Sequence, residues 1–466
     1  EMSATKLNGK TRGIGVRHYQ AMMTFAGVVL SYSMRVNLSV AIVAMTDTET
    51  ESDIKVLPWD SSRKGIILSA MFWGYVVLPA PGGHLARIVG PKYVAFWVMV
   101  VSSIATILCP YIALNYNWMV FCFTRGFIGL AQGSFIPCIN VHIARWVPLS
   151  EKNRIFSGVF VGTQVGASLT LLVAGYLASS SWGWPSIFYV TGLCSLIWSL
   201  VWFFLGADSP DSHPTISDYE RDFIKSELMA SENISTLRTP WRKILTSGPV
   251  IAIYASSFGY VWNYWTLATM LPSYFSHVLG YNIKNNGLIS SLPYLLKCFL
   301  ILAISWITDY TTTRNIISLS VSRKIWNSIA MWGGAITLLG LLLTNSVIGA
   351  TILLTISLSI GAGVFCGYFV NQNDLAPNFS GVIMGLANSM GNINAIIGPL
   401  FTGFVVKDET SRDQWMVVFY VCAATMFVGN LLFVIMGSAT VQPWNEPNKE
   451  IIKQEKSSEK ENNAHV

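Results

Sequence analysis

Three strongly basic residues lie well inside apolar stretches of this chain, and no acidic residue accompanies them there. Arg35 lies in YSMRVNLSVAIVAM, Arg125 in FCFTRGFIGLAQG and Lys297 in SLPYLLKCFLIL. A charge inside a bilayer is costly and usually faces a cavity or a partner. Since no carboxylate is evident in the same stretches, the expected partner is a bound anion. A guanidinium suits this role because its planar fork of donors matches carboxylate and phosphate groups.

The composition places these residues in a membrane protein. The chain has 466 residues, of which 52% are hydrophobic and 12% charged, whereas a soluble chain carries about 25% charged residues. A helix needs about 20 apolar residues to cross a bilayer, and most of the tracts without Asp, Glu, Lys or Arg are longer than that. These tracts are 93–124, 155–207, 244–283, 325–373 and 375–406. The pattern predicts a polytopic α-helical protein.

The apolar stretches divide into twelve predicted spans, six on each side of a polar connection. The spans cover residues 19–45, 64–86, 92–113, 117–143, 155–178, 187–207, 249–276, 286–308, 325–343, 347–370, 380–405 and 415–437. We therefore expect five regions. They are a cytoplasmic N-terminal tail at 1–18, a six-helix half at 19–207, a cytoplasmic linker at 208–248, a second six-helix half at 249–437 and a disordered cytoplasmic tail at 438–466.

Lysine and arginine are concentrated in the loops on one predicted side of the membrane. Three loops on the other side, near residues 114–117, 179–186 and 344–347, contain neither. Because loops rich in these residues face the cytoplasm, we expect both termini to be cytoplasmic. Within the linker, SDYERDFIKSELM has the periodicity of an amphipathic helix.

The loops after the second and the eighth spans resemble each other weakly. The first reads GGHLARIVGPK and the second SWITDYTTTRN, with Arg87 and Asp309 at equivalent places. Halves that repeat one another around a midplane site are typical of major facilitator transporters. We expect an all-α membrane protein with the major facilitator fold, in which Arg87 and Asp309 belong to gating loops. Arg87 stands where an acidic residue is usual in this loop.

Several long segments resemble solute carrier family 17, whose anion transporters include sodium–phosphate carriers, sialin and the vesicular glutamate transporters. In chain order they are RVNLSVAIVAM (35–45), FWGYVVLPAPGG (72–83), RGFIGLAQGSFIPCI (125–139), RWVPLSEKNR (145–154), GADSPDSHPTIS (206–217), NNGLISSLPYL (285–295), NDLAPNFSGVIMGLANSMG (373–391) and QWMVVFYV (414–421). The resemblance is closest to insect proteins described as inorganic phosphate cotransporters. It implies a carrier that moves an anion by alternating access.

The resemblance also implies roles for individual residues. Arg35 matches the first-span arginine that binds the anionic substrate in the family. Arg125 matches a fourth-span arginine tied to binding or gating, although a structural charge bonded to main-chain carbonyl groups is an alternative. Two aromatic residues match pocket positions of the family. The expected substrate site consists of Arg35, Arg125, Tyr75, Gln132, Tyr260 and Trp265.

Two positions in the second half differ from the family. Lys297 has no counterpart there, and a lysine that reaches the interface or a cytoplasmic gate is as good an interpretation as a substrate contact. Vesicular glutamate carriers have an arginine in the seventh span where this chain has Tyr260. This difference predicts that the second half contributes no cation to the site, which argues against glutamate as the substrate.

The residues expected to couple transport to an ion also differ from those of proton-coupled members of the family. Gln132 and Asn140 stand where proton-coupled relatives carry Glu and His, and an amide cannot exchange a proton near neutral pH. His142 lies roughly 200° around the helix from Asn140 and is expected to be structural. Sodium held by neutral oxygens is therefore preferred. The candidate ligands are Asn140, Asn388 and Asn392, the last two of which could instead form a hydrogen-bond network between helices.

The sequence thus predicts a secondary transporter of a phosphate-type or carboxylate anion, working by sodium-coupled symport. A proton-coupled or potential-driven carrier of an acidic sugar, similar to sialin, is the alternative in the same class. An anion sensor without flux is the alternative in another class. We expect no enzyme activity, metal site, cofactor or nucleic-acid partner; the partners are the anion and the lipid bilayer. The expected location is the plasma membrane rather than a lysosome or vesicle, and the expected state is a monomer.

Overall fold

The computed structural model describes residues 15–47, 56–148, 151–232 and 239–445, and every regular element in them is a helix. Nine of the described helices are long and apolar enough to cross a membrane. The predicted all-α membrane fold is confirmed. The count of twelve spans stays a prediction, because several of the remaining helices are short or carry many polar residues.

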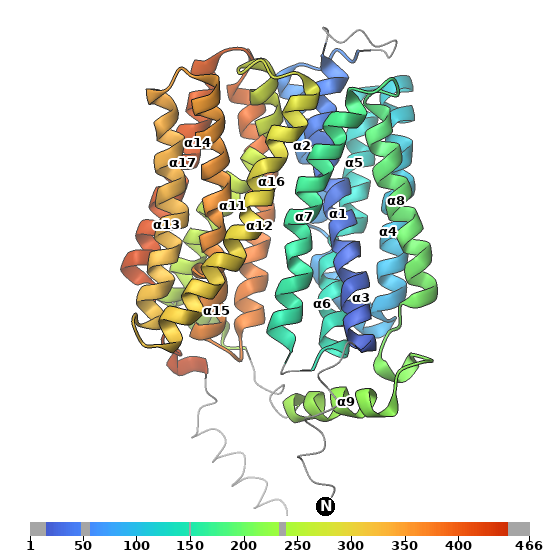
Figure 1. Ribbon diagram of the computed structural model, residues 1–466, viewed down its shortest axis with the longest axis vertical. Coiled ribbons are helices and arrows are strands. Elements are labelled where there is room, and N and C mark those ends of the chain that lie inside the picture. Colours follow the sequence, from blue (N-terminus) through green and yellow to red (C-terminus); the bar gives the residue numbers. More distant parts are fainter. Residues whose placement is uncertain (1–14, 48–55, 149–150, 233–238, 446–466) are drawn as a thin grey trace, which may run out of the picture.

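The helices form two groups that stand side by side, while α9 lies across one end of the molecule (Figure 1). The first group consists of α1 (Val16–Thr46), α2 (Ser61–Tyr75), α3 (Pro79–Ile88), α4 (Pro91–Asn115), α5 (Trp118–Gly133), α6 (Phe135–Trp146), α7 (Lys152–Ala178) and α8 (Pro185–Leu205). Between the groups lie α9 (Asp218–Glu232) and α10 (Trp241–Thr246). The second group consists of α11 (Gly248–His277), α12 (Ile283–Thr313), α13 (Leu319–Gly340), α14 (Val347–Ile360), α15 (Tyr368–Leu375), α16 (Ser380–Val405) and α17 (Arg412–Met436).

Two of the predicted spans in the first half are each divided into two helices. The second breaks between α2 and α3 just before Pro79, whose ring lacks a backbone N–H and fixes φ. The fourth breaks at Ser134, between α5 and α6. The two breaks pack against each other, since the Ser134 hydroxyl donates to the Leu78 carbonyl at 3.4 Å. Irregular backbone at membrane depth needs protein or a cavity around it, and this pairing supplies part of that environment.

The two groups of helices touch at the end of the molecule away from α9. Gly65 on α2 lies against Gly403 on α16, so that a Cβ at Gly65 would come within 2.7 Å of the Pro399 carbonyl oxygen. Gly175 on α7 and Gly287 on α12 make a second close approach, with 2.8 Å from a Cβ at the first to the Cα of the other. Small residues allow helix backbones to approach this closely.

An ion cluster joins the two groups at the same end. The Lys64 ammonium on α2 lies 2.8 Å from a Glu409 carboxylate oxygen, and His277 Nε2 at the end of α11 lies 3.2 Å from the same oxygen. Ser62 adds a hydrogen bond across the groups, from its hydroxyl to the Gly403 carbonyl at 3.1 Å. Polar and close-packed contacts together hold this end closed.

At the α9 end the short helices pack within their own group: α3 and α6 pack against helices of the first group, and α15 packs against helices of the second. A Cβ built at Gly158 near the start of α7, or at Gly381 or Gly385 near the start of α16, would meet no atom within 4 Å. The same helix, α16, is packed against α2 around Pro399 and Gly403 farther along its length. The bundle is therefore closed at one end and open at the end that carries α9.

The predicted linker helix is present as α9, and it is fixed to the start of α1. The Glu220 carboxylate accepts the backbone N–H groups of Val16 and Arg17 at 3.0 and 3.2 Å and the Arg17 guanidinium at 2.9 Å. A carboxylate at a helix N-terminus also interacts favourably with the helix dipole. Arg17 binds Glu151 as well, at 2.8 Å, and this contact lowers the pKa of the Glu151 carboxyl.

We expect Gly65→Val to prevent α2 from approaching α16, because the added side chain would overlap the Pro399 carbonyl. Spin labels on Arg63→Cys and Lys407→Cys, in a background free of native cysteines, would report the separation by double electron–electron resonance. The label distance should increase in Gly65→Val. It should be unchanged in Gly381→Val, which adds the same side chain to open space on α16. An unchanged distance in Gly65→Val would contradict this account of the closed end.

Candidate anion-binding site

Arg35 is buried on α1, with 7% of its surface exposed. Its guanidinium carbon lies 4.3 Å from the ring centre of Tyr75, 4.6 Å from that of Tyr32 and 5.8 Å from that of Trp265. Its Nε and Nη2 have no hydrogen-bond partner, and none of the ion pairs among the described residues includes it. Cation–π attraction returns about 0.5–2 kcal/mol, so the buried donors still lack an acceptor.

Arg35 and Arg125 line one small internal cavity between α1, α2, α5 and α11. The other lining residues are uncharged: Val36, Leu38, Ser39, Leu68, Phe72, Trp265, Ala268 and Thr269. Two cations in a common cavity without an acid create a positive potential, which low-dielectric walls strengthen. The two arginines that the sequence singled out lie together in this cavity, and their charge favours an anion. The cavity has a free volume of about 10 Å³, which is room for about one water molecule, so an anion could enter only if the surrounding side chains move apart.

Arg125 is held more firmly than Arg35, although its contacts are long. It is 1% exposed, and its Nη1 lies 3.4 Å from the Met34 carbonyl oxygen and 3.5 Å from Asn37 Oδ1. Asn37 in turn donates to the Thr191 hydroxyl at 3.1 Å. These contacts match the structural alternative expected from the sequence, yet Arg125 Nε remains unpaired. Arg125 therefore both fixes α5 to α1 and faces the cavity.

The position of Lys297 on α12 differs from two predictions made from the sequence. It is 1% exposed, so its ammonium does not reach an interface. It donates to the Tyr260 hydroxyl, and its Nζ lies 4.6 Å from the Tyr264 ring centre and 5.8 Å from that of Phe365. The second half therefore does contain a buried cation beside Tyr260, contributed by α12 rather than α11. Sequence comparison at the seventh span missed it because the charge comes from a different helix.

A wall of aromatic residues connects the two buried cations. The Tyr264 ring centre lies 5.2 Å from that of Trp265, which contacts Arg35, and 6.1 Å from that of Tyr260, which contacts Lys297. Tyr32 and Tyr264 were not predicted to belong to the site. For Tyr32 a signal was available, because it precedes Arg35 by three residues and therefore shares its helix face.

The amides that replace the expected proton relay lie in different surroundings. Gln132 is buried, and its Oε1 accepts the Ser31 hydroxyl at 3.2 Å while its Nε2 is unpaired. Asn140 is exposed at the open end of the bundle. His142 is 1% exposed and packs against Trp202, with ring centres 5.0 Å apart. The sequence argument that His142 points away from Asn140 agrees with this packing.

The other candidate ion ligands do not form the buried network considered for α16. Asn388 is exposed and Asn392 is half-buried. The buried amide of this helix is Asn394, which donates to the Phe258 carbonyl at 2.8 Å. Asn388 and Asn392 lie on the helix face that also carries Gly381 and Gly385, because residues four apart share a face. That face borders open space at the α9 end. Among the described residues, no cluster of three or more His, Cys, Asp and Glu side chains could hold a metal ion.

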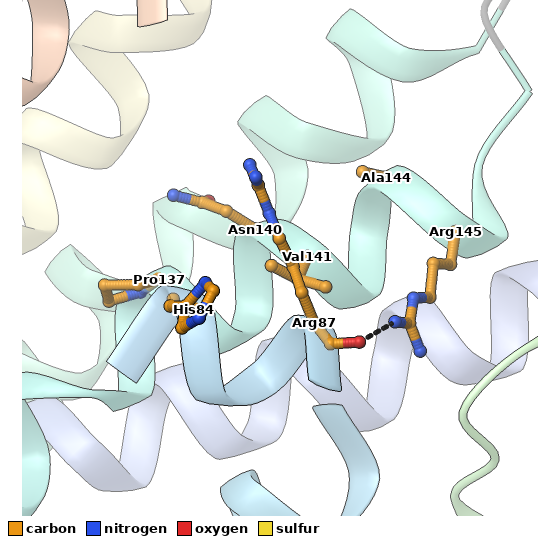
Figure 2. Close-up of a pocket in the computed structure, with 8 residues that line it drawn as sticks. His84, Arg87, Pro137, Asn140, Val141, Ala144 and Arg145 are labelled. Carbon is orange, nitrogen blue, oxygen red and sulfur yellow. Dashed lines mark hydrogen bonds between the residues drawn. The ribbon is translucent and has the colours of Figure 1, made fainter. Parts of the chain in front are cut away.

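A second, larger cavity of about 600 Å³ lies at the α9 end between α3 and α6 (Figure 2). It contains Arg87, one of the two expected gating residues, together with Gly83, His84, Pro137, Asn140, Val141, Ala144 and Arg145. The other expected gating residue, Asp309, is exposed in the last turns of α12. The ion pair of the second half at this end is instead Arg323–Asp374, with 2.7 Å between nitrogen and oxygen.

Comparison with known sequences supports a transport protein. Residues 24–398 match the family described as the Major Facilitator Superfamily. A Drosophila ananassae protein named "Putative inorganic phosphate cotransporter" is 32% identical, covering 92% of this chain and 94% of that protein. Human vesicular glutamate transporter 2 is 31% identical, covering 93% and 76%. These relatives confirm the resemblance inferred from the sequence.

Solved structures of low sequence identity share the fold. The inward-open xylose transporter XylE from E. coli aligns with a TM-score of 0.67 at 13% identity, covering 90% of this chain and 96% of that one. A bacterial homologue of the lysosomal transporter Spinster, inward-facing and unoccupied, aligns with a TM-score of 0.66 at 13% identity, covering 92% and 97%. The helical arrangement of this chain is therefore shared with transporters of this type.

Because Lys297 has no acidic partner among the described residues, we expect that removing its charge will not lower the stability of the protein. Lys297→Met keeps a long side chain but removes the unpaired buried charge, so its thermal unfolding midpoint in detergent should equal or exceed that of the unmodified protein. Lys64→Met is the matched comparison, and its midpoint should fall because Glu409 would lose its lysine partner. A lower midpoint in Lys297→Met would show that its ammonium serves the fold.

Proposed function

Because this chain belongs to the Major Facilitator Superfamily, we propose that it is a secondary active transporter that carries an anion across a membrane by alternating access. The chain is a multi-pass membrane transporter rather than an enzyme. The identity of the cargo as an anion rests mainly on one observation. Arg35 is buried with unpaired guanidinium donors in a cavity whose only other charged lining residue is Arg125.

The electrostatics of this cavity favour a carboxylate or phosphate group over a neutral solute. A hydrogen bond between ionised groups is shorter and roughly twice as strong as one between neutral groups. Phosphate and carboxylate oxygens can each accept two guanidinium N–H groups. Tyr75, Tyr32 and Trp265 would contact the apolar part of an organic anion. Inorganic phosphate and small carboxylates are therefore the proposed substrates, in keeping with the names of the relatives.

Lys297 widens the range of proposed substrates. The sequence argument against glutamate relied on the lack of a cation in the second half. Since Lys297 supplies one beside Tyr260, that argument no longer holds. A substrate with two negative groups, such as a dicarboxylate, is compatible with cations on both helix groups.

The conformation corresponds to one state of an alternating-access cycle. The contacts between α2 and α16 and between α7 and α12 close one end, while the α9 end is open. We place the α9 end in the cytoplasm, because the loops rich in Lys and Arg lie there, and assign the inward-facing state to this structure. By the same rule both termini are cytoplasmic. The plasma membrane is the proposed location.

Sodium is the proposed coupling ion, in a symport mechanism. Gln132 and Asn140 cannot carry a proton, and His142 is enclosed by Trp202 and Trp146 rather than by the cavity. Hard cations bind neutral carbonyl, amide and hydroxyl oxygens. The exposed amide of Asn388 and the half-buried amide of Asn392, both on α16, provide such oxygens on the face that borders the open space.

Arg35→Gln should reduce uptake of the transported anion into proteoliposomes by at least about 30-fold. This estimate follows from a loss of roughly 2 kcal/mol or more when one partner of a buried charge pair is truncated. Arg35→Lys should recover only part of the activity, since an ammonium lacks the planar fork. Arg63→Gln, which removes an exposed arginine from α2, is the control and should transport normally. Unchanged uptake in Arg35→Gln would refute the proposed site.

Gradients imposed one at a time should identify the driving ion. Labelled phosphate and a panel of mono- and dicarboxylates would be offered to proteoliposomes under sodium, proton or potential gradients. We expect an inward sodium gradient to stimulate uptake and a proton gradient without sodium to leave it at the basal level. Proton-driven uptake would contradict sodium coupling. Anion binding without flux under any gradient would contradict transport itself and identify a sensor.

A further inference from the structure

The cavity between α3 and α6 has a charge pattern that the Arg35 site does not explain. His84 and Arg87 come from α3, and Asn140 and Arg145 from α6, and no acidic residue lines the cavity. We propose that this cavity is a second anion-binding site, which takes a phosphate or carboxylate group at the open end of the bundle. The site is separate from Arg35, and its binding can be tested without measuring transport.

Two arginines from different helices, Arg87 of α3 and Arg145 of α6, line the cavity. Arg145 Nη2 donates to the Arg87 carbonyl at 2.9 Å, which satisfies an acceptor in the last turn of α3 and fixes the guanidinium beside that helix end. The Arg87 side chain runs away from its own carbonyl and past Asn140, so that the guanidinium of Arg87 points away from that of Arg145 (Figure 2). Arg87 and Asn140 are exposed, whereas Arg145 is half-buried. Donors of two helices therefore border the same space.

Arg87 and Arg145 differ in their pairing from Arg323 of the second half. In the second half, Arg323 at the same end binds Asp374 at 2.7 Å and donates to the Cys366 carbonyl at 3.1 Å. Neither Arg87 nor Arg145 takes part in an ion pair among the described residues. An external anion is the partner that would balance their charge.

The size and exposure of the cavity define the ligand. A volume of about 600 Å³ exceeds what one phosphate needs and suits a small organic anion or a phosphorylated headgroup. Because Arg87 is exposed, its attraction for an anion should weaken as ionic strength rises. The shared chemistry is a phosphate or carboxylate group, which either a free anion or an anionic lipid could supply.

Binding of inorganic phosphate to the purified full chain in detergent tests this proposal. The measurement starts from Arg35→Gln, which removes the proposed substrate site, so that residual binding reports the second site alone. We expect Arg35→Gln to retain phosphate binding by calorimetry. Adding Arg87→Gln to it should weaken binding at least about fivefold, and adding Arg145→Gln as well should abolish it. Adding Arg314→Gln, an exposed arginine elsewhere at the same end, is the control and should have no effect.

Each result bears on the proposal. Loss of all phosphate binding in Arg35→Gln, or unchanged binding after Arg87→Gln, would overturn it. Arg87→Gln should fold normally, because the Arg87 side chain makes no hydrogen bond among the described residues. The same titration in nanodiscs identifies the source of the ligand. If phosphatidylglycerol prevents phosphate from binding and phosphatidylcholine does not, the site holds a lipid headgroup; if neither interferes, it holds a free anion.

Discussion

A positive charge buried at membrane depth without an acidic partner is the constraint on which the rest of this structure depends. Arg35 and Lys297 both meet this description, at 7% and 1% exposure. An acid beside either of them would lower the cost of burial and would also compete with an anionic ligand. The protein instead surrounds both cations with aromatic rings, which attract a cation without neutralising it. Three of these rings, Tyr260, Tyr264 and Trp265, come from α11.

Oppositely charged pairs are found at the ends of the bundle rather than in its middle. Lys64–Glu409 lies at the closed end, and Arg17–Glu151 and Arg323–Asp374 lie at the α9 end. The Lys64–Glu409 pair joins the two helix groups, and its side chains are only 9% and 13% exposed. The pair must break when the closed end opens, and separating two largely buried charges costs stability. The glycine contacts of α2 with α16 and of α7 with α12 also lie between the groups, and they can separate without repacking side chains. These contacts together keep this end closed in the structure.

The two halves of the protein differ in the partners of their arginines at the α9 end. In the second half Asp374 neutralises Arg323, whereas in the first half Arg145 binds only the main chain at Arg87. Arg87 and Arg145 thus have no acidic partner among the described residues, whereas Arg17 and Arg323 at the same end do. An anion that approaches these two arginines is attracted over roughly a Debye length, about 8 Å at physiological ionic strength. The charge pattern at the mouth therefore has the same sign preference as the interior.

The sequence alone determined the membrane class, the helical fold and the presence of isolated cations at Arg35, Arg125 and Lys297 within apolar segments, because apolar length and isolated charges are local properties of the chain. It also indicated that His142 is structural, since that inference needs only helical periodicity. What it could not determine were contacts between residues far apart in the chain. The position of Lys297 beside Tyr260, the pairing of Arg323 with Asp374, and the burial of Asn394 rather than Asn388 all depend on how helices are rotated against each other. Tertiary packing decides that rotation, because many side chains from several helices must fit at once, and no single segment records the result.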